Sequence, residues 1–501
     1  MKQEISGEKM RRLESFKRLI NLSLVAVCLI LEILVFTYFW FYHFSGSLVE
    51  DLVFWRRGYL LQVAIYSVLL FFFSKMYGGL RIGYLKITEI IFSQIFATLA
   101  VNILTYAQLS LMAMELFRFR YFFQMLVYQI IIIVIWINIA NKIYKSVFPP
   151  RKLLLVHGDR PIKDILNKFH SRKDRYKIVK SIHIKNGVDN IFREISAGYG
   201  AGEYHAVVIW DTSVQERNYL MKYCYSHSIR FYIMPKITDV ILLGAEEMYM
   251  FDTPILLTRE YRLTVEQRLI KRLLDLVCAV VLLVITSPFM VITAIAIKIY
   301  DHGPILYRQI RCTENQRQFQ IMKFRSMRTD AEKDGVARLA ARHDDRITPV
   351  GRFIRKVRID ELPQLFNILK GDMSFIGPRP ERPEIIEQYV EIMPEFAYRM
   401  KVKAGLAGYA QVYGKYNTSP YDKLKLDLTY IENYSLWLDL KLMLLTLKIL
   451  FWPDSTEGVE NDQVTAFKQE YRRKKEEKPD AAVNNKADVS EENKAAETVR
   501  S

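Results

Sequence analysis

The stretch "VRIDELPQLFNILKGDMSFIGPRP" (residues 357–380) places two carboxylates, Asp360 and Glu361, side by side ahead of a proline-stiffened turn. Four basic side chains surround them in the sequence: Arg355, Lys356, Arg358 and Arg379. An isolated Asp-Glu pair usually marks a solvated helix start, but carboxylates among cations also bind Mg²⁺ together with substrate phosphates, or act as nucleophiles. Both of these uses need an ionised acid, and we expect the neighbouring positive charges to lower its pKa.

Two further basic segments flank this stretch. Residues 321–328 read "IMKFRSMR" and bring Lys323 and Arg325 near a short predicted strand, while residues 377–384 read "GPRPERPE" and set Glu381 just after the turn. Arginine forks and lysine ammonium groups match phosphate oxygens. The combination of a carboxylate pair, an arginine turn and a basic strand predicts phosphoryl transfer from a nucleotide-linked donor at a membrane surface.

The membrane part of this prediction comes from composition. Of the 501 residues, 51% are hydrophobic and 13% are aromatic, and the formal net charge is +17. The apolar residues gather in long blocks, and the basic excess favours an anionic membrane surface or phosphate-rich ligands. We find no nucleic-acid-binding motif. The cysteines show no paired spacing, so neither disulfides nor a zinc site is predicted for Cys28, Cys224, Cys278 and Cys312.

Four apolar blocks stand near the N-terminus, each about long enough to cross a ~30 Å hydrocarbon layer. They cover residues 19–43, 58–74, 86–113 and 122–141. The N-terminus, the loop after the second block and the exit from the fourth block are basic. By the positive-inside rule, both ends of a four-helix transmembrane bundle over residues 1–148 are therefore expected in the cytoplasm.

A Rossmann-like α/β domain is expected over residues 149–258. Its predicted strands, with helical stretches between them, are residues 152–158, 177–184, 205–210 and 229–235, a pattern that predicts βαβ units and a parallel sheet. Only Gly158 stands where a dinucleotide fingerprint needs three glycines. The domain is therefore predicted to be structural or regulatory, without a cofactor, which argues against a nucleotide-sugar dehydrogenase or epimerase.

A fifth apolar block, residues 262–300, leaves the membrane topology open. Its uncharged segment, "LVCAVVLLVITSPFMVITAIAI", is long enough to span a bilayer, but Ser287-Pro288 lies near the middle. Proline removes a backbone donor and clashes with the preceding turn, which kinks or breaks a helix. A straight span would export everything after residue 300, whereas a hairpin that dips into one leaflet would keep that region in the cytoplasm.

The motifs "KFRSM", "DELPQL.N.L.GDMS" and "GPRPE", in this order after a Ser-Pro-broken apolar helix, resemble those of the bacterial sugar transferases. These are monotopic polyprenyl-phosphate phosphoglycosyl transferases. The resemblance covers about residues 265–452, and the preceding bundle and α/β domain resemble the long form of the family. It implies transfer of a sugar 1-phosphate from a nucleotide diphosphate sugar, usually UDP-linked, to undecaprenyl phosphate. That reaction releases UMP and starts a capsule, O-antigen or exopolysaccharide repeat unit.

The resemblance also implies an architecture and a location. The C-terminal α/β catalytic domain, residues 259–465, would be anchored by a re-entrant helix at about 268–300 and would face the cytoplasm from the bacterial inner membrane. The Ser287-Pro288 pair matches the break in the family's re-entrant helix, which favours the dipping hairpin. A homodimer is expected as well.

Carried over to this sequence, the resemblance makes Asp360 the nucleophile that holds a covalent phosphosugar. Glu361 becomes its partner, which helps to bind Mg²⁺ and to activate the acceptor. The residues implied as phosphate or substrate ligands are Lys323, Arg325, Arg355, Arg379, Glu381 and Gln411.

The chain departs from the family pattern in "KAGLAGYAQVYGK" (residues 403–415), where Ala404, Ala407 and Lys415 replace the common Pro, Thr and Arg. The donor sugar is therefore less defined than the reaction. One alternative stays open, a membrane-anchored nucleotide-sugar-binding scaffold or regulator without turnover. A transferase of the polytopic class is not favoured, because these apolar blocks are too few for it.

The C-terminal end carries two further expectations. Residues 434–452 are predicted to form either an interfacial amphipathic helix anchored by Trp437 and Trp452 or a buried core helix. Residues 466–501 are charged and poor in apolar side chains, which predicts a disordered tail.

Overall fold

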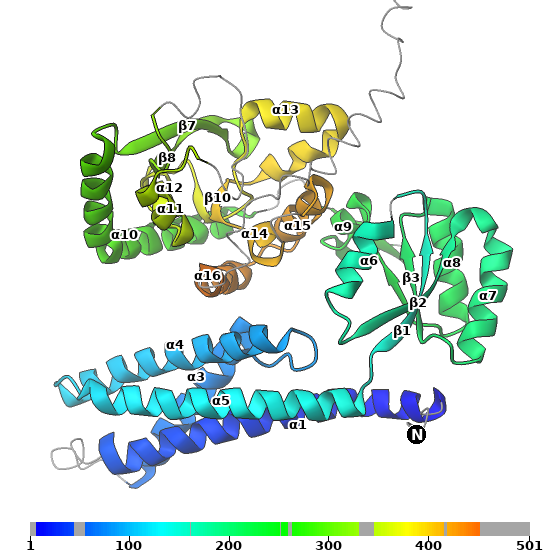
Figure 1. Ribbon diagram of the computed structural model, residues 1–501, viewed down its shortest axis with the longest axis horizontal. Coiled ribbons are helices and arrows are strands. Elements are labelled where there is room, and N and C mark those ends of the chain that lie inside the picture. The colour runs from blue at the N-terminus through cyan, green and yellow to red at the C-terminus, as the bar shows by residue number, and fades with distance from the viewer. Residues whose placement is uncertain are drawn as a thin grey trace, which may run out of the picture. The chain divides into compact units, whose positions relative to one another are not determined.

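The computed structural model describes residues 7–44, 56–160, 162–250, 252–258, 263–329, 345–414 and 418–450. The chain divides into two compact units, Met1–Pro235 and Lys236–Ser501, and each is described by itself (Figure 1). The predicted tail at 466–501, together with Lys415 and Trp452, lies outside the described residues.

Long apolar helices form the first part of the first unit. They are α1 (Gly7–Phe39), continued by the π-helical turn η1 (Trp40–Phe44), α3 (Arg56–Tyr77), α4 (Ile87–Ala113) and α5 (Phe119–Val147). Each contains a stretch that is long and apolar enough to cross a membrane. The prediction of a membrane protein with several apolar helices at its N-terminal end is therefore confirmed. The sides on which these helices face one another share one hydrophobic core.

Polar side chains lie inside this core. Glu32 is fully buried; its Oε1 accepts a hydrogen bond from Gln94 Nε2 at 2.8 Å, and its Oε2 accepts one from Thr98 Oγ1 at 2.6 Å. Gln129 Nε2 donates to the Tyr66 hydroxyl at 2.8 Å. Polar groups in an apolar bundle need such partners within the protein, because lipid tails offer none. These contacts connect α1 with α4 and α3 with α5.

The second part of this unit is a four-stranded parallel sheet in the order β2-β1-β3-β4. The strands are β1 (Arg151–His157), β2 (Tyr176–His183), β3 (Ala206–Trp210) and β4 (Phe231–Ile233), which confirms the predicted α/β domain with a parallel sheet. The helices between them are α6 (Ile162–His170), η2 (Ile184–Asn186), α7 (Val188–Gly200) and α8 (Val214–Ser226). Successive side chains of β1 point to opposite faces, so Leu154 packs with α7 and α8 while Leu155 packs with α6. Figure 1 shows α6 on one side of the sheet and α7 and α8 on the other.

The carboxyl edge of such a sheet is where open α/β folds bind ligands. Here the loops that follow β1 and β3 meet directly. A Cβ on Gly158 would lie 1.8 Å from the carbonyl oxygen of Asp211, so only glycine fits there. Arg160 Nε pairs with the Asp211 carboxylate at 3.1 Å across the same gap. The one glycine of the incomplete fingerprint thus serves the close approach of two loops.

The second unit begins with α9 (Ile237–Leu242), the antiparallel hairpin β5 (Glu246–Met250) and β6 (Thr253–Leu257), and the long helix α10 (Val265–Asp301). Next comes the antiparallel hairpin of β7 (Leu306–Cys312) and β8 (Gln318–Phe324), with the turn η3 (Glu314–Gln316) between its strands. It is followed by α11 (Pro349–Lys356), η4 (Ile359–Glu361) and α12 (Gln364–Lys370). The remaining elements are β9 (Ser374–Ile376), α13 (Pro383–Ile392), η5 (Pro394–Lys401), β10 (Gly405–Ala407), α14 (Tyr409–Tyr413), α15 (Pro420–Glu432) and α16 (Leu436–Leu450).

The start of this unit bears on the expected domain limits. We placed residues up to 258 with the α/β domain, yet Ile237 and Val240 of α9 belong to the hydrophobic core of the second unit, beside α15. Along the sequence, the boundary between the two compact units accordingly falls between Pro235 and Lys236. The other predicted boundaries stay predictions.

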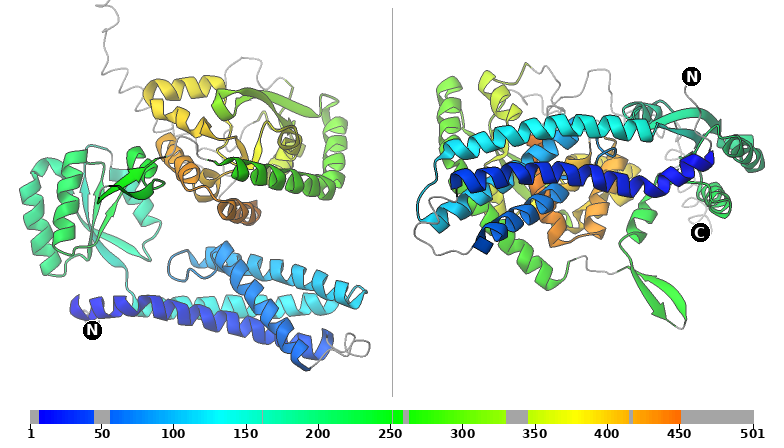
Figure 2. Two further views of the ribbon diagram at one scale, coloured as in Figure 1. Left: turned by 180° about the vertical axis from the view of Figure 1, so that it is seen from behind. Right: turned by 90° about the horizontal axis from the view of Figure 1, so that it is seen from below.

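The helix α10 runs without interruption across Ser287 and Pro288. Proline has no N–H for the carbonyl four residues earlier, which belongs to Val284. The Ser287 hydroxyl donates to that carbonyl instead, at 2.9 Å. Figures 1 and 2 show α10 as two straight segments joined by a sharp bend.

Buried polar contacts hold the first half of α10 to the rest of the unit. Lys271 Nζ pairs with the fully buried Asp439 of α16 at 2.6 Å and donates to the Ile376 carbonyl at 3.0 Å. Asp275 Oδ1 accepts from the Phe375 backbone N–H at 2.8 Å. Large apolar side chains are exposed farther along: Val284, Ile285, Phe289, Ile292, Ile295 and Ile299. An exposed apolar stretch of this size suits contact with lipid.

The last described helix, α16, has two different faces. Asp439 and Leu442 are fully buried against the core, whereas Trp437 is 47% exposed. The helix therefore combines features of the two forms that we predicted, a core helix and an interfacial helix.

Candidate active site

Asp360 and Glu361 lie on the 3-10 turn η4, between α11 and α12. The preceding helix starts at a capped end, where Thr348 Oγ1 accepts a hydrogen bond from the Gly351 N–H at 2.9 Å. After that helix, Arg358 takes a left-handed conformation with φ of +57°, which is uncommon for a residue other than glycine. The left-handed residue and the 3-10 turn together set the two acids between the helices, not on a solvated helix start.

Glu361 is surrounded by cations. Its Oε1 lies 3.1 Å from Lys323 Nζ and 3.0 Å from Arg379 Nη2, and its Oε2 lies 3.8 Å from Arg358 Nη1. Burial alone would raise the pKa of Glu361, but the three cations outweigh it and hold the pKa well below its usual value. The predicted lowering of an acid's pKa is therefore found at Glu361, which stays an anion at neutral pH.

Asp360 differs from its neighbour. Within the described part of the chain, its carboxylate makes no hydrogen bond or ion pair. Burial and the negative charge of Glu361 raise the pKa of Asp360 to about 6, against the opposing charges of Lys323, Arg355 and Arg379. Our expectation of a lowered pKa was thus wrong for this acid, because its neighbour takes the cations. Asp360 is still mostly ionised above about pH 6.

The position of Lys323 depends on an asparagine for which we predicted no role. Lys323 lies on β8, and the fully buried Asn367 of α12 bonds to the backbone of that strand. Asn367 Oδ1 accepts from the Met322 N–H at 3.0 Å, and its Nδ2 donates to the Gln320 carbonyl at 2.8 Å. This contact fixes β8 against the helix that follows Asp360 and Glu361. The motif "DELPQLFN" contains the residue, but no local signal reveals its partner.

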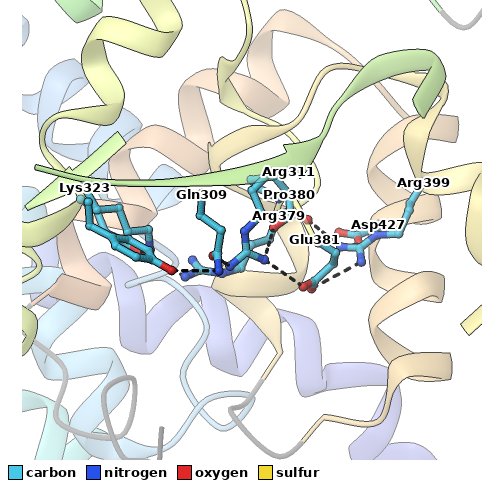
Figure 3. Close-up of polar contacts among 10 residues, drawn as sticks. Gln309, Arg311, Lys323, Arg379, Pro380, Glu381, Arg399 and Asp427 are labelled. Carbon is cyan, nitrogen blue, oxygen red and sulfur yellow. Dashed lines mark hydrogen bonds and ion pairs between the residues drawn. The ribbon is translucent and has the colours of Figure 1, made fainter. Parts of the chain in front are cut away.

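The Gly-Pro-Arg-Pro turn follows β9 and brings Arg379 to Glu361. Glu381, which we expected among the substrate ligands, turns toward Arg311 and Arg399, as Figure 3 shows. Its carboxylate lies 3.7 Å from Arg311 Nη1 and 3.6 Å from Arg399 Nη1. Arg379 thus belongs to the cations around Glu361, whereas Glu381 belongs to a second cluster with Arg311 and Arg399.

The other predicted ligands lie in different surroundings. Arg355, on α11, acts on Asp360 through its positive charge. Arg325 is buried and forms an ion pair with Asp301 at the end of α10. Gln411 is on α14, where its Oε1 is buried and has no hydrogen-bond partner among the described residues. Lys323, Arg355 and Arg379 thus act on the two acids, whereas no contact within the described segments brings Arg325 or Gln411 to them.

A metal ion at this site would rely on Asp360 and Glu361. The described residues contain no group of three or more His, Cys, Asp or Glu side chains arranged to hold a metal. A hard cation that keeps several waters needs only one or two carboxylates and the substrate phosphates. The unpaired carboxylate of Asp360 fits that requirement.

Comparison with known proteins connects this site to a family. A family model described as bacterial sugar transferase matches residues 266–453, which run from the first turn of α10 through α16 and include both acids. A UDP-N-acetylgalactosamine-undecaprenyl-phosphate N-acetylgalactosaminephosphotransferase of Aeromonas hydrophila is 44% identical over 184 residues, or 36% of this chain and 43% of that protein.

Two other relatives carry glucose in their names. An undecaprenyl-phosphate glucose phosphotransferase of Komagataeibacter xylinus is 42% identical over 186 residues, or 36% of this chain and 35% of that protein. A UDP-glucose:undecaprenyl-phosphate glucose-1-phosphate transferase of Caulobacter vibrioides is 42% identical over 190 residues, or 37% of this chain and 71% of that protein. The match thus spans less than half of the Aeromonas and Komagataeibacter proteins and more than two thirds of the Caulobacter protein.

Proposed function

This chain belongs to the bacterial sugar transferase family, and from that premise we propose that it transfers a sugar 1-phosphate from a UDP-sugar to undecaprenyl phosphate with release of UMP. The names of the three relatives all describe sugar phosphotransfer to undecaprenyl phosphate. The lipid-linked product would begin a polysaccharide repeat unit.

One observation carries the proposal: the two adjacent acids are in opposite electrostatic situations. Glu361 binds Lys323, Arg379 and Arg358, whereas Asp360 has no partner among the described residues and a pKa near 6. A carboxylate that is ionised at neutral pH and not paired with a Lys or Arg side chain is a better nucleophile than one locked in such an ion pair. Cations beside it lower the repulsion between this anion and a diphosphate.

The reaction then has two balanced steps. The carboxylate of Asp360 attacks the phosphorus that carries the sugar, the bond from that phosphorus to the bridging oxygen breaks, and UMP leaves with the electron pair. A phosphate oxygen of undecaprenyl phosphate next attacks the same phosphorus, and the Asp360 carboxylate is released. Lys323 and Arg379, fixed on Glu361, would neutralise the phosphoryl oxygens during both steps.

Mg²⁺ is part of this proposal as a cofactor. Asp360 and Glu361 would hold it together with donor phosphates, and it would supply neutralisation of the diphosphate charge. The support is the donor set, two carboxylates with one of them unpaired.

We also propose that α10 enters and leaves on the same side of the inner membrane, so that the catalytic unit faces the cytoplasm. The support is the bent helix with its Ser287 hydroxyl bond, the exposed apolar side chains, and the buried Lys271–Asp439 pair that ties the first half of the helix to the catalytic core. A homodimer stays a prediction.

Cysteine labelling of intact cells tests this topology in a background without the native cysteines. The exposed positions Glu391 of α13 and Asp189 of α7 would carry Glu391→Cys and Asp189→Cys. Both should react with an impermeant maleimide only after permeabilisation. Labelling of Glu391→Cys alone in intact cells would show that α10 is a straight span.

The reaction is tested by UMP release from UDP-glucose, UDP-galactose and UDP-N-acetylgalactosamine, with purified protein, Mg²⁺ and undecaprenyl phosphate. One donor should yield UMP, and Asp360→Asn should abolish this UMP release. The matched control Asp189→Asn, at an exposed position of α7, should retain the release. Without acceptor, radiolabelled sugar phosphate should remain on the wild-type protein. No UMP from any donor would favour the scaffold or regulator, and full activity of Asp360→Asn would exclude the aspartyl intermediate.

A further inference from the structure

A second layer of buried charge lies behind the turn that carries Arg379. Arg399 of η5 and Asp427 of α15 are 4% and 1% exposed, and their side chains pair at 2.8 Å. Glu381 lies between Arg399 and Arg311, at 3.6 and 3.7 Å (Figure 3). None of these side chains pairs with Asp360 or Glu361 in the described part of the chain, so the phosphotransfer scheme leaves them without a role.

The same layer holds the backbone of the turn. Arg399 Nη2, the nitrogen that pairs with Asp427, also donates to the Arg379 carbonyl at 3.1 Å. Arg311 Nη1 donates to the Pro380 carbonyl at 3.3 Å, and the Cys312 N–H donates to the Glu381 carbonyl at 3.1 Å. Three consecutive carbonyls of the turn are therefore fixed from behind, while the Arg379 side chain reaches forward to Glu361.

We propose that Arg399 and Asp427 are positioning residues, which hold the Arg379–Glu381 turn so that the Arg379 guanidinium stays on Glu361 beside the reacting phosphate. The inference rests on the proposed function for its catalytic consequence but not for its structural one. Asp427 orients the guanidinium, and the guanidinium holds the turn. A planar fork can bond a carboxylate, a second carboxylate and a carbonyl at once, which a lysine ammonium on a flexible stem does not reproduce.

The test uses the full-length protein in lipid nanodiscs, with Arg399→Lys and Asp427→Asn. A matched control is Arg317→Lys, because the Arg317 side chain also pairs with a buried aspartate, Asp372 at 3.2 Å, but makes none of the turn contacts described above. With the UDP-sugar that the wild type uses, Arg399→Lys should lower kcat about 10- to 100-fold, the scale expected for a misplaced charged group, and change KM less.

Backbone hydrogen exchange separates positioning from a general loss of stability. Peptides over residues 376–382 should exchange faster in Arg399→Lys and Asp427→Asn, while those of β1 stay unchanged and the control matches the wild type. Wild-type kcat in both variants, or lower kcat with unchanged exchange at 376–382, would overturn the proposal. If Arg399→Lys does not fold, Asp427→Asn decides alone. If the wild type transfers no sugar phosphate, the proposed function fails and the exchange experiment still decides whether the pair holds the turn.

Discussion

Two glutamates, one fully buried in the apolar bundle and one partly buried in the catalytic unit, are satisfied by different kinds of partner. Glu32 receives its hydrogen bonds from the neutral groups of Gln94, Thr98 and Cys28. No Lys or Arg among the described residues pairs with it. Glu361 is bound instead by Lys323, Arg379 and Arg358. A glutamate side chain is thus part of a neutral hydrogen-bond network in the bundle and of a cluster of charges in the catalytic unit.

The difference follows from how far solvent reaches the partners of each glutamate. A cation inside an apolar bundle would have to be desolvated as well, so neutral donors satisfy Glu32 at a lower cost. The cations around Glu361 keep access to solvent, with 45% of the Arg379 side chain and 28% of the Arg358 side chain exposed. Only cations with an accessible side can also bind a phosphate. The network around Glu32 therefore joins helices, whereas the cluster around Glu361 prepares a surface for an anion.

The largest effect is expected when Glu361 loses its charge. Glu361→Gln keeps the shape but no longer orders Lys323 and Arg379, so the rate of UMP release should fall about 100-fold. The control is Glu391→Gln, at an exposed position of α13, which should behave as the wild type. A rate for Glu361→Gln close to that of its control would mean that the cation cluster has no part in the reaction.

A smaller effect is expected in the bundle. Glu32→Leu leaves the donors of Gln94 and Thr98 buried without an acceptor, which should destabilise the protein by about 1–3 kcal/mol. Glu32→Gln retains an acceptor oxygen and should cost less. Thermal unfolding in nanodiscs compares the two variants. Wild-type stability of Glu32→Leu would contradict the role of neutral hydrogen bonding, and a loss with Glu32→Gln as large as with Glu32→Leu would show that the charge itself matters.

The smallest expected effect is a shift in pH dependence. Asp360 must be ionised to attack, so kcat should fall as the pH drops through about 6. The positive charge of Arg355 favours the ionised form of Asp360. Arg355→Gln should therefore raise the pKa of Asp360 and move the acid limb of the kcat–pH profile, where kcat falls with pH, to higher pH. Lys356→Gln removes an exposed cation one position away and serves as the control. A limb that moves to lower pH in Arg355→Gln, or equally in both variants, would contradict the assignment to Asp360.

Much of the fold could be predicted because it rests on local patterns. The runs at 152–158 and 205–210 appear as β1 and β3, since continuous apolar stretches of this length form buried parallel strands. The apolar blocks appear as long helices for the same reason of hydropathy. The start of the second unit was harder to predict, because α9 is short and its two buried apolar side chains find their partners on α15.

The candidate site was predictable in its members but not in their pairing. The motifs name Lys323, Arg325 and Arg379 together, and nothing in them tells which cation reaches an acid. Arg325 is only two residues from Lys323 but forms its ion pair with Asp301, whereas Lys323 bonds Glu361. Arg325 follows the last residue of β8, where the alternation of side chains along a strand no longer applies, so its direction depends on tertiary contacts that residue order alone does not specify.

The sequence by itself determined the apolar helices, the parallel sheet and the family motifs, because hydropathy, strand length and residue identity are properties of short segments. The tertiary structure decided which acid is clamped and which is left unpaired. It also decided that Arg399 and Asp427, 28 residues apart in the sequence, meet behind the Arg379 turn. These outcomes depend on distances between segments, and charges interact through space, so only the folded chain brings Lys323, Glu361 and Arg379 within hydrogen-bonding range.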